Sequence, residues 1–175
     1  MEKGKAYELS IKNDINDNTD ENVKAHRPDF SGNSKGEVAD VMVVWHYYEP
    51  NVAYLELKKR SGVDEGNRKV VMSGSSDGQN GIEELEELID ESPPWTKQYV
   101  VYKFQNRAPL IFHAPTLLDY LRDDDYEGTV EEWHGARLTR GGNISIIKPE
   151  LSYWQSSTAA NDDYKEICDY LGVPN

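Results

Sequence analysis

The sequence has little cysteine, no long apolar run and few basic residues. One cysteine in 175 residues, Cys168, excludes a disulfide within the chain and a zinc site built from cysteines, and it fits a reducing, cytoplasmic setting. The apolar runs are a few residues long, so no membrane span is expected. The N-terminus is charged and lacks the apolar segment of a signal peptide. One globular domain is the expectation, and 37% hydrophobic residues suffice for its core.

Positive charge is scarce, because 19 Lys and Arg stand against 32 Asp and Glu, giving a net charge of −13. A nucleic-acid-binding protein is normally basic over its binding face, so this balance argues against one. The deficit is uneven: residues 1–112 carry 14 bases against 20 acids, and residues 113–175 carry 5 against 12. Acidity of this size suits a protein kept soluble in a salt-rich cytoplasm. We therefore expect a halophilic archaeon or its virus as the source, although Lys supplies 12 of the 19 bases.

Motifs for several other kinds of site are missing. The four histidines show no metal-ligand spacing. The Gly- and Ser-rich segment 73–81 lacks the G-x-x-x-x-G-K-[ST] pattern of a nucleotide phosphate loop. The acidic run 123–125 lacks the spaced ligands of a calcium loop. These absences exclude the common signatures of zinc, nucleotide and calcium binding.

The most informative stretch is residues 37–60, which reads as two apolar strands joined by a turn. Side chains alternate between the two faces of a strand, so Glu56 and Lys58 share one face of the second strand. Asp40 opens the first strand, and antiparallel pairing would place it opposite Glu56. Two carboxylates and an ammonium are therefore predicted to converge on an apolar sheet.

This grouping indicates a metal site. Carboxylates held close together on a dry sheet repel each other, and one of them would protonate. Mg²⁺ removes that conflict, since it prefers oxygen ligands and is held by one or two carboxylates and several waters; Mn²⁺ is an expected substitute. Lys58 would then orient a water or neutralise developing charge. A surface hairpin with a solvated Glu56–Lys58 pair is the alternative that the same residues allow.

Further motifs flank this hairpin in a particular order. They are Gly4 to Glu8, then the Ser- and Gly-rich loop Ser31 to Gly36, then Asp40, then Glu56-Leu57-Lys58. This order resembles the PD-(D/E)xK nuclease superfamily and, more closely, the archaeal Holliday junction resolvases. The resemblance covers roughly the first 112 residues.

The resemblance implies a fold and an activity. The fold would be α/β, a restriction-endonuclease-like mixed central β-sheet flanked by helices. Residues 1–112 would form the nuclease core, and residues 113–175 a C-terminal extension packed on the same domain. The activity would be metal-dependent cleavage of branched double-stranded DNA by paired phosphodiester hydrolysis. Cutting two opposed strands requires two active sites, which implies a two-fold homodimer.

The resemblance also implies roles for single residues. Asp40 and Glu56 would bind Mg²⁺, with the Leu57 carbonyl as an extra ligand, and Glu8 would assist from the N-terminal helix. Ser31 would steer the phosphate, with Ser34 as the alternative. Polar and basic residues near the site would contact DNA: Lys5, Lys24, Arg27, Ser34, Lys35, Lys59, Arg60, Arg68 and Lys69.

Periodicity and breakers predict the other elements. Lys103 lies on the expected strand 98–104, where it would either contact DNA or be exposed. Thr116 would cap the expected helix 117–122. The expected helices are 3–15, 82–91, 117–122 and 162–171, and Gly172 would end the last of them. The polar residues that follow Ile15 favour a turn. The expected strands are 23–28, 98–104, 109–112 and part of 144–154.

Two other functions stay open at this stage. The same fold could carry a restriction-like, nicking or exonuclease enzyme. The chain could also be a catalytically inactive DNA-binding or assembly module, which the acidity favours and the complete Asp, Glu and Lys set opposes.

Overall fold

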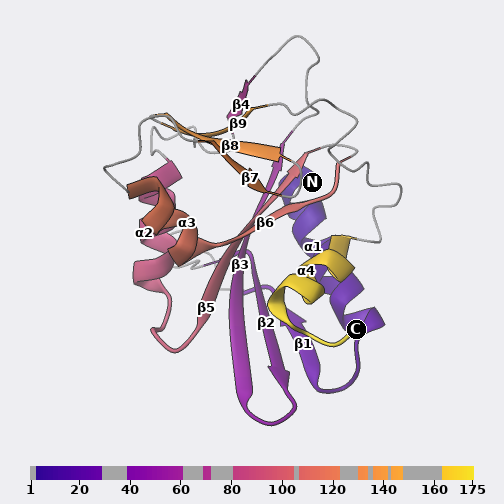
Figure 1. Ribbon diagram of the computed structural model, residues 1–175. Helices are drawn as coiled ribbons and strands as arrows, with labels where there is room; N and C mark the ends of the chain where they lie inside the picture. The colour runs from indigo at the N-terminus through magenta and orange to yellow at the C-terminus, as the bar shows by residue number, and fades with distance from the viewer. Residues whose placement is uncertain are drawn as a thin grey trace.

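The protein folds around a five-stranded sheet, with a smaller four-stranded sheet at one end (Figure 1). Its architecture is taken from a computed structural model. The described residues are 3–28, 39–60, 69–71, 81–104, 107–122, 130–133, 136–141, 143–147 and 163–175. Within them, no helix is both long enough and apolar enough to cross a membrane.

The main sheet has the strand order β1-β2-β3-β5-β6. Its pairs are antiparallel except β3 with β5, so the sheet is mixed and the α/β prediction is confirmed. A parallel pair needs a long crossover, and helix α2 lies within the one that joins β3 to β5. The strands are β1 Val23–His26, β2 Val41–His46, β3 Pro50–Arg60, β5 Lys97–Phe104 and β6 Leu110–His113.

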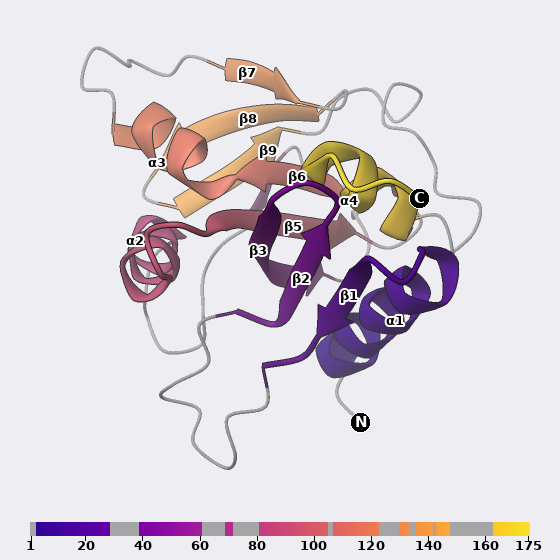
Figure 2. The same cartoon turned by 90° about the horizontal axis from the view of Figure 1, so that it is seen from below.

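Helices α1 (Lys3–Asn18) and α4 (Asp163–Leu171) cover one face of this sheet (Figure 2). Tyr7, Ile11 and Ile15 recur every four residues along α1 and are buried against alternate residues of the strands. Each such side chain contributes about 1.5–3 kcal/mol when fully buried. The hydrophobic cluster on this face is the larger of the two described core clusters.

Helix α1 continues beyond the expected end at Ile15. The side chain of Asn16 donates to the Ala25 carbonyl at 2.9 Å and accepts from the Ala25 amide at 2.8 Å. These bonds satisfy the edge of β1, and the hydroxyl of Thr19 closes the last turn on the Ile15 carbonyl at 2.6 Å. The tertiary contact with β1 stabilises a segment whose polar composition favours a turn.

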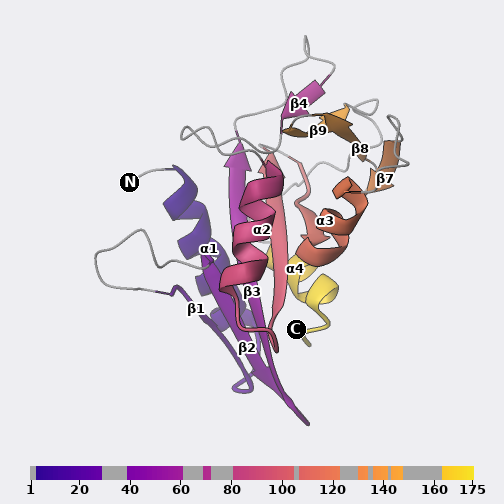
Figure 3. The ribbon, with the colours of Figure 1, turned by 90° about the vertical axis from the view of Figure 1, so that its left-hand side faces the viewer.

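Helices α2 (Gly81–Glu91) and α3 (Ala114–Arg122) cover the opposite face, where α2 lies along β3 and β5 (Figure 3). The bounds of α2 confirm the prediction from its apolar spacing. Helix α3 begins earlier than expected, at Ala114, so Thr116 lies inside the helix and is not its cap. Its hydroxyl instead lies 2.7 Å from Nδ1 of His113.

The smaller sheet has the order β4-β9-β8-β7, with every pair antiparallel. It joins a strand from residues 1–112 to three strands from residues 113–175. Strand β9 overlaps the expected range 144–154, whereas β4, β7 and β8 were not predicted. The strands are β4 Lys69–Val71, β7 Val130–Trp133, β8 Ala136–Gly141 and β9 Asn143–Ile147.

Helix α4 ends at Gly172, as its sequence predicts. Gly172 has a φ of 78°, the left-handed conformation that glycine adopts without a Cβ penalty. The Val173 amide donates to the Cys168 carbonyl at 2.8 Å, and the Gly172 amide donates to the Asp169 carbonyl at 3.3 Å. These two bonds form a Schellman motif, and the chain reversal returns Val173 to the core.

Lys103 is buried, contrary to the expectation of an exposed or DNA-contacting lysine. Its ammonium lies 3.0 Å from Asp163 Oδ2 and donates to the Arg107 carbonyl at 2.6 Å. The exposed fraction of its side chain is 9%, and that of Asp163 is 2%. The partner that permits this burial lies 60 residues away, so no local pattern around Lys103 could indicate it.

Candidate active site

The site begins where β2 starts beside β3. Asp40 precedes β2, and its backbone amide donates to the Leu55 carbonyl at 3.0 Å. Its carboxylate oxygen Oδ2 accepts from the Leu57 amide at 2.7 Å. Asp40 is therefore tied to β3 by both its main chain and its side chain. This pairing continues the register Val41 to Leu55 and places Asp40 beside Glu56, as predicted.

Glu56 and Lys58 lie on the same face of β3, as the alternation predicts. Leu55 and Leu57 point to the opposite face, into the core under α1. The ammonium of Lys58 lies 2.9 Å from Glu56 Oε1. Both side chains are half-buried, with exposed fractions of 23% and 27%. The pair is thus partly withdrawn from water, unlike a solvated surface pair.

Glu84 of α2 is a further site residue that sequence reasoning missed. Its carboxylate lies 3.8 Å from the Lys58 ammonium, and its side chain is only 17% exposed. From sequence alone, the acids of α2 are most simply a solvated face. The signal that could have found Glu84 is its place beside the apolar stripe, four residues before the buried Leu88.

Glu8 lies on α1. It is only 14% exposed and pairs with Arg27 at 3.3 Å. Its charge is one of those that raise the pKa of Asp40, which places it within electrostatic reach of that carboxyl. The structure brings Asp40, Glu56 and Lys58 together, and the charge of Glu8 acts on Asp40 from α1.

The charges of the site are poorly balanced without a cation. Burial, and then the neighbouring Glu56, raise the pKa of Asp40 from 3.8 to about 8, although the Leu57 amide opposes the shift. Burial alone would lower the pKa of Lys58, but Glu56 and Glu84 raise it overall. At neutral pH Asp40 is therefore mainly protonated, while Lys58 is charged.

This donor set fits a hard divalent cation. A cation beside Asp40 and Glu56 would offset their repulsion and favour the ionised form of Asp40. Among the described residues, no group of three or more His, Cys, Asp or Glu side chains is arranged to hold a metal. The residues that would hold the cation are Asp40 and Glu56, with the Leu57 carbonyl that the resemblance implies; water would complete the shell, as Mg²⁺ commonly allows.

The other predicted DNA contacts are placed unevenly. Lys5, Lys24 and Lys59 are exposed, and the Lys59 ammonium lies 5.6 Å from the centre of the Tyr7 ring. Arg27 is paired with Glu8. Arg60 ends β3 and Lys69 begins β4. Four predicted site residues lie outside the described residues: Ser31, Ser34, Lys35 and Arg68.

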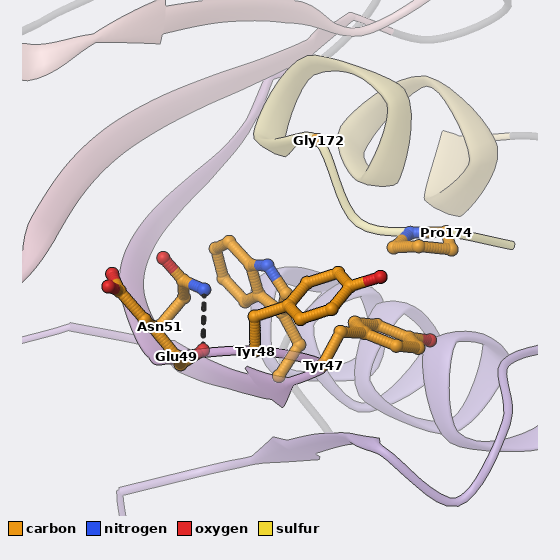
Figure 4. Close-up of a pocket in the computed structure, with 7 residues that line it drawn as sticks. Tyr47, Tyr48, Glu49, Asn51, Gly172 and Pro174 are labelled. Carbon is orange, nitrogen blue, oxygen red and sulfur yellow. Dashed lines mark hydrogen bonds between the residues drawn. The ribbon is translucent and has the colours of Figure 1, made fainter.

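A pocket of about 520 Å³ lies elsewhere, between the β2–β3 turn and the tail after α4 (Figure 4). Tyr47, Tyr48 and Pro174 are among its lining residues, and Tyr48 is 97% exposed. It lies at the start of β3, about 20 Å along the strand from Glu56 at roughly 3.3 Å per residue. This pocket is therefore separate from the carboxylate site.

Comparisons with known proteins give likeness in structure and none in sequence. The chain matches no protein-family model, and no curated protein is significantly similar to it in sequence. It is similar to the solved structure of Hjc, a Holliday junction resolvase from Archaeoglobus fulgidus, with 14% identity and a TM-score of 0.49 over 99% of each chain. At that level the likeness decides nothing about activity.

Proposed function

We propose that the chain is a magnesium-dependent endonuclease that cuts branched double-stranded DNA, in the manner of a Holliday junction resolvase. The observation that carries this proposal is the Asp40 carboxylate, held by the Leu57 amide beside Glu56 and Lys58. The order of the motifs along the chain supports the same function. Burying one carboxyl group beside a second carboxylate destabilises the folded protein. Such a perturbed pKa is typical of functional sites.

The residues of the site have distinct roles in this proposal. Asp40, Glu56 and the Leu57 carbonyl would hold Mg²⁺ or Mn²⁺, and Glu8 would act through the water shell. The bound cation would polarise the scissile phosphodiester and generate a nucleophilic hydroxide at neutral pH. Lys58 would orient the attacking water and stabilise the charge that develops on the phosphate. Ser31, or Ser34 in its place, would hydrogen-bond the phosphate.

Binding of the DNA would depend on local charge. Exposed bases such as Lys5, Lys24 and Lys59 would contact phosphates and release counterions, so binding weakens as salt rises. Two opposed cuts need two sites, and the proposal therefore includes a two-fold homodimer. A halophilic source would require that binding persist in molar salt.

The net charge of −13 favours a second candidate function, a catalytically inactive DNA-binding or assembly module. Such a module would keep the Lys58–Glu56 pair as a structural contact and would cut nothing. A restriction-like, nicking or exonuclease enzyme would instead cut linear duplex as readily as a junction. One experiment separates these three functions.

The experiment is a gel cleavage assay on a labelled four-way junction and on a linear duplex of the same arms. Purified protein is incubated with Mg²⁺ or Mn²⁺, from low to molar KCl, beside the variant Glu56→Gln. The matched control is Glu49→Gln, the same substitution at an exposed residue before β3. Circular dichroism checks that each protein is folded, and sedimentation gives its oligomeric state.

We expect paired, symmetrical nicks near the branch, and a rate more than about a hundredfold lower in Glu56→Gln, since a catalytic cation contributes several kcal/mol. Glu49→Gln should cut like the unaltered protein. Equal cutting of both substrates would retain the nuclease and refute the junction preference. No cutting at any salt, by a folded protein, would refute the enzyme and favour the module.

A further inference from the structure

Lys58 lies between two carboxylates that come from different elements of the fold. Glu56 of β3 is 2.9 Å from its ammonium, and Glu84 of α2 is 3.8 Å from it. Leu85 and Leu88 are 2% and 5% exposed and pack α2 against the sheet. The position of Glu84 is therefore set by the core and does not depend on a flexible surface contact.

The two carboxylates have different duties if Glu56 is a metal ligand, a condition that rests on the proposed function. When Glu56 binds the cation, its negative charge is shared with the metal and compensates the Lys58 ammonium less. Lys58 is only 23% exposed, and a partly buried ammonium without a counter-charge is destabilised. Glu84 belongs to another element and can keep its charge beside Lys58.

We propose that Glu84 is a positioning residue that takes over the Lys58 ammonium when Glu56 binds the cation. Lys58 then stays in the site, free of Glu56 and close to the position of the attacking water. Without Glu84, Lys58 would remain on Glu56 and compete with the cation for it. The contact between α2 and β3 thereby becomes part of the catalytic apparatus.

Mn²⁺ binding tests this proposal without relying on activity. The dissociation constant is measured by electron paramagnetic resonance for Glu84→Gln, Lys58→Met and the double variant. The matched control is Glu83→Gln, which removes an acid from the same first turn at an exposed position. Glu83→Gln and Glu84→Gln each remove one negative charge from the N-terminal turn of α2, so both lose a favourable interaction with the helix dipole. Urea unfolding checks that the variants are folded.

We expect Glu84→Gln to weaken Mn²⁺ binding about tenfold, the lower end of what loss of an outer partner costs at metal sites. Lys58→Met should bind Mn²⁺ more tightly, because the competitor is gone, and the double variant should match Lys58→Met. Glu83→Gln should stay within about twofold of the unaltered protein. A tenfold loss that persists in the Lys58→Met background would show that Glu84 acts on the cation directly, and it would overturn the proposal.

Cleavage provides the second measurement. Glu84→Gln should lower the single-turnover rate at saturating Mn²⁺ about tenfold, and Glu84→Asp should recover part of it. Unchanged Mn²⁺ binding in Glu84→Gln, or no Mn²⁺ binding by the unaltered protein, would overturn the inference. If the protein binds Mn²⁺ but cuts no DNA, the proposed function fails, and the Mn²⁺ cycle alone then decides the role of Glu84.

Discussion

The buried pair of Lys103 and Asp163 joins three elements of the fold. The ammonium of Lys103 in β5 contacts both carboxylate oxygens of Asp163 in α4, at 3.1 and 3.0 Å. The hydroxyl of Tyr7 in α1 donates to Asp163 at 3.1 Å. Burial, and then the charge of Asp163, raise the pKa of that hydroxyl well above 10.0. The pair therefore links α1 and α4 to the sheet beneath them.

Replacing Lys103 by Met should destabilise the protein strongly. Methionine keeps most of the length and the apolar stem but removes the positive charge, which leaves the buried Asp163 without the counter-charge of Lys103. Breaking one side of a buried ion pair costs about 3–5 kcal/mol. For a chain of this length each kcal/mol lowers the melting temperature by about 2–4 °C. The expected loss is therefore about 6–20 °C.

The companion variants identify the cause. Lys103→Met with Asp163→Leu removes both charges, and a buried pair replaced by apolar groups is often neutral or stabilising. This double variant should recover most of the lost stability. Lys97→Met, at the exposed start of the same strand, should change the free energy of unfolding by less than about 0.5 kcal/mol.

Urea unfolding followed by circular dichroism measures all four proteins at neutral pH. A Lys103→Met variant within about 1 kcal/mol of the unaltered protein would refute the reasoning, since it would show that the ion pair contributes little to stability. A double variant as unstable as the single one would also refute it. In that case the loss would come from packing around residue 103.

Two other predictions concern stability. Without metal, Asp40 binds its proton more tightly when folded, since its pKa is about 8 against 3.8. Its contribution to the free energy of unfolding is fully present below about pH 4. This contribution is lost as the pH rises through 8, by up to about 1.4 kcal/mol per pH unit. Asp40→Asn should remove this slope from urea unfolding between pH 5 and 9, and an unchanged slope would contradict the shift. Gly172→Ala should cost about 1 kcal/mol of unfolding free energy, because its φ of 78° is left-handed while a Cβ would meet no atom within 4 Å. A neutral result in the same assay would show that the tail reverses without the Schellman motif.

Local patterns were sufficient for most of the main sheet. The alternation in β3 predicted that Glu56 and Lys58 share a face, and the apolar spacing of α2 predicted its bounds. These features depend on the geometry of a single strand or helix, which a few neighbouring residues determine. The hairpin of β2 and β3 added Asp40, because a short connection leaves antiparallel pairing as the simple solution.

Errors arose where a residue's environment comes from a distant segment. Asn16 extends α1 because it bonds to Ala25, and a polar sequence alone favours a turn there. Lys103 is buried because Asp163 meets it, although lysine on a strand is usually exposed. In each case a specific partner outweighs the intrinsic preference of the residue.

The sequence by itself determined which residues each element presents and in which direction. It thereby determined that Asp40, just before β2, would meet Glu56 and Lys58 of β3. Only the tertiary structure decided the distances between elements: Glu84 of α2 beside Lys58, Glu8 of α1 within reach of Asp40, and the helix pair α1 and α4 tied to β5. The physical reason is that periodicity is a local property of the backbone. How closely two elements approach depends on the packing of all the side chains between them.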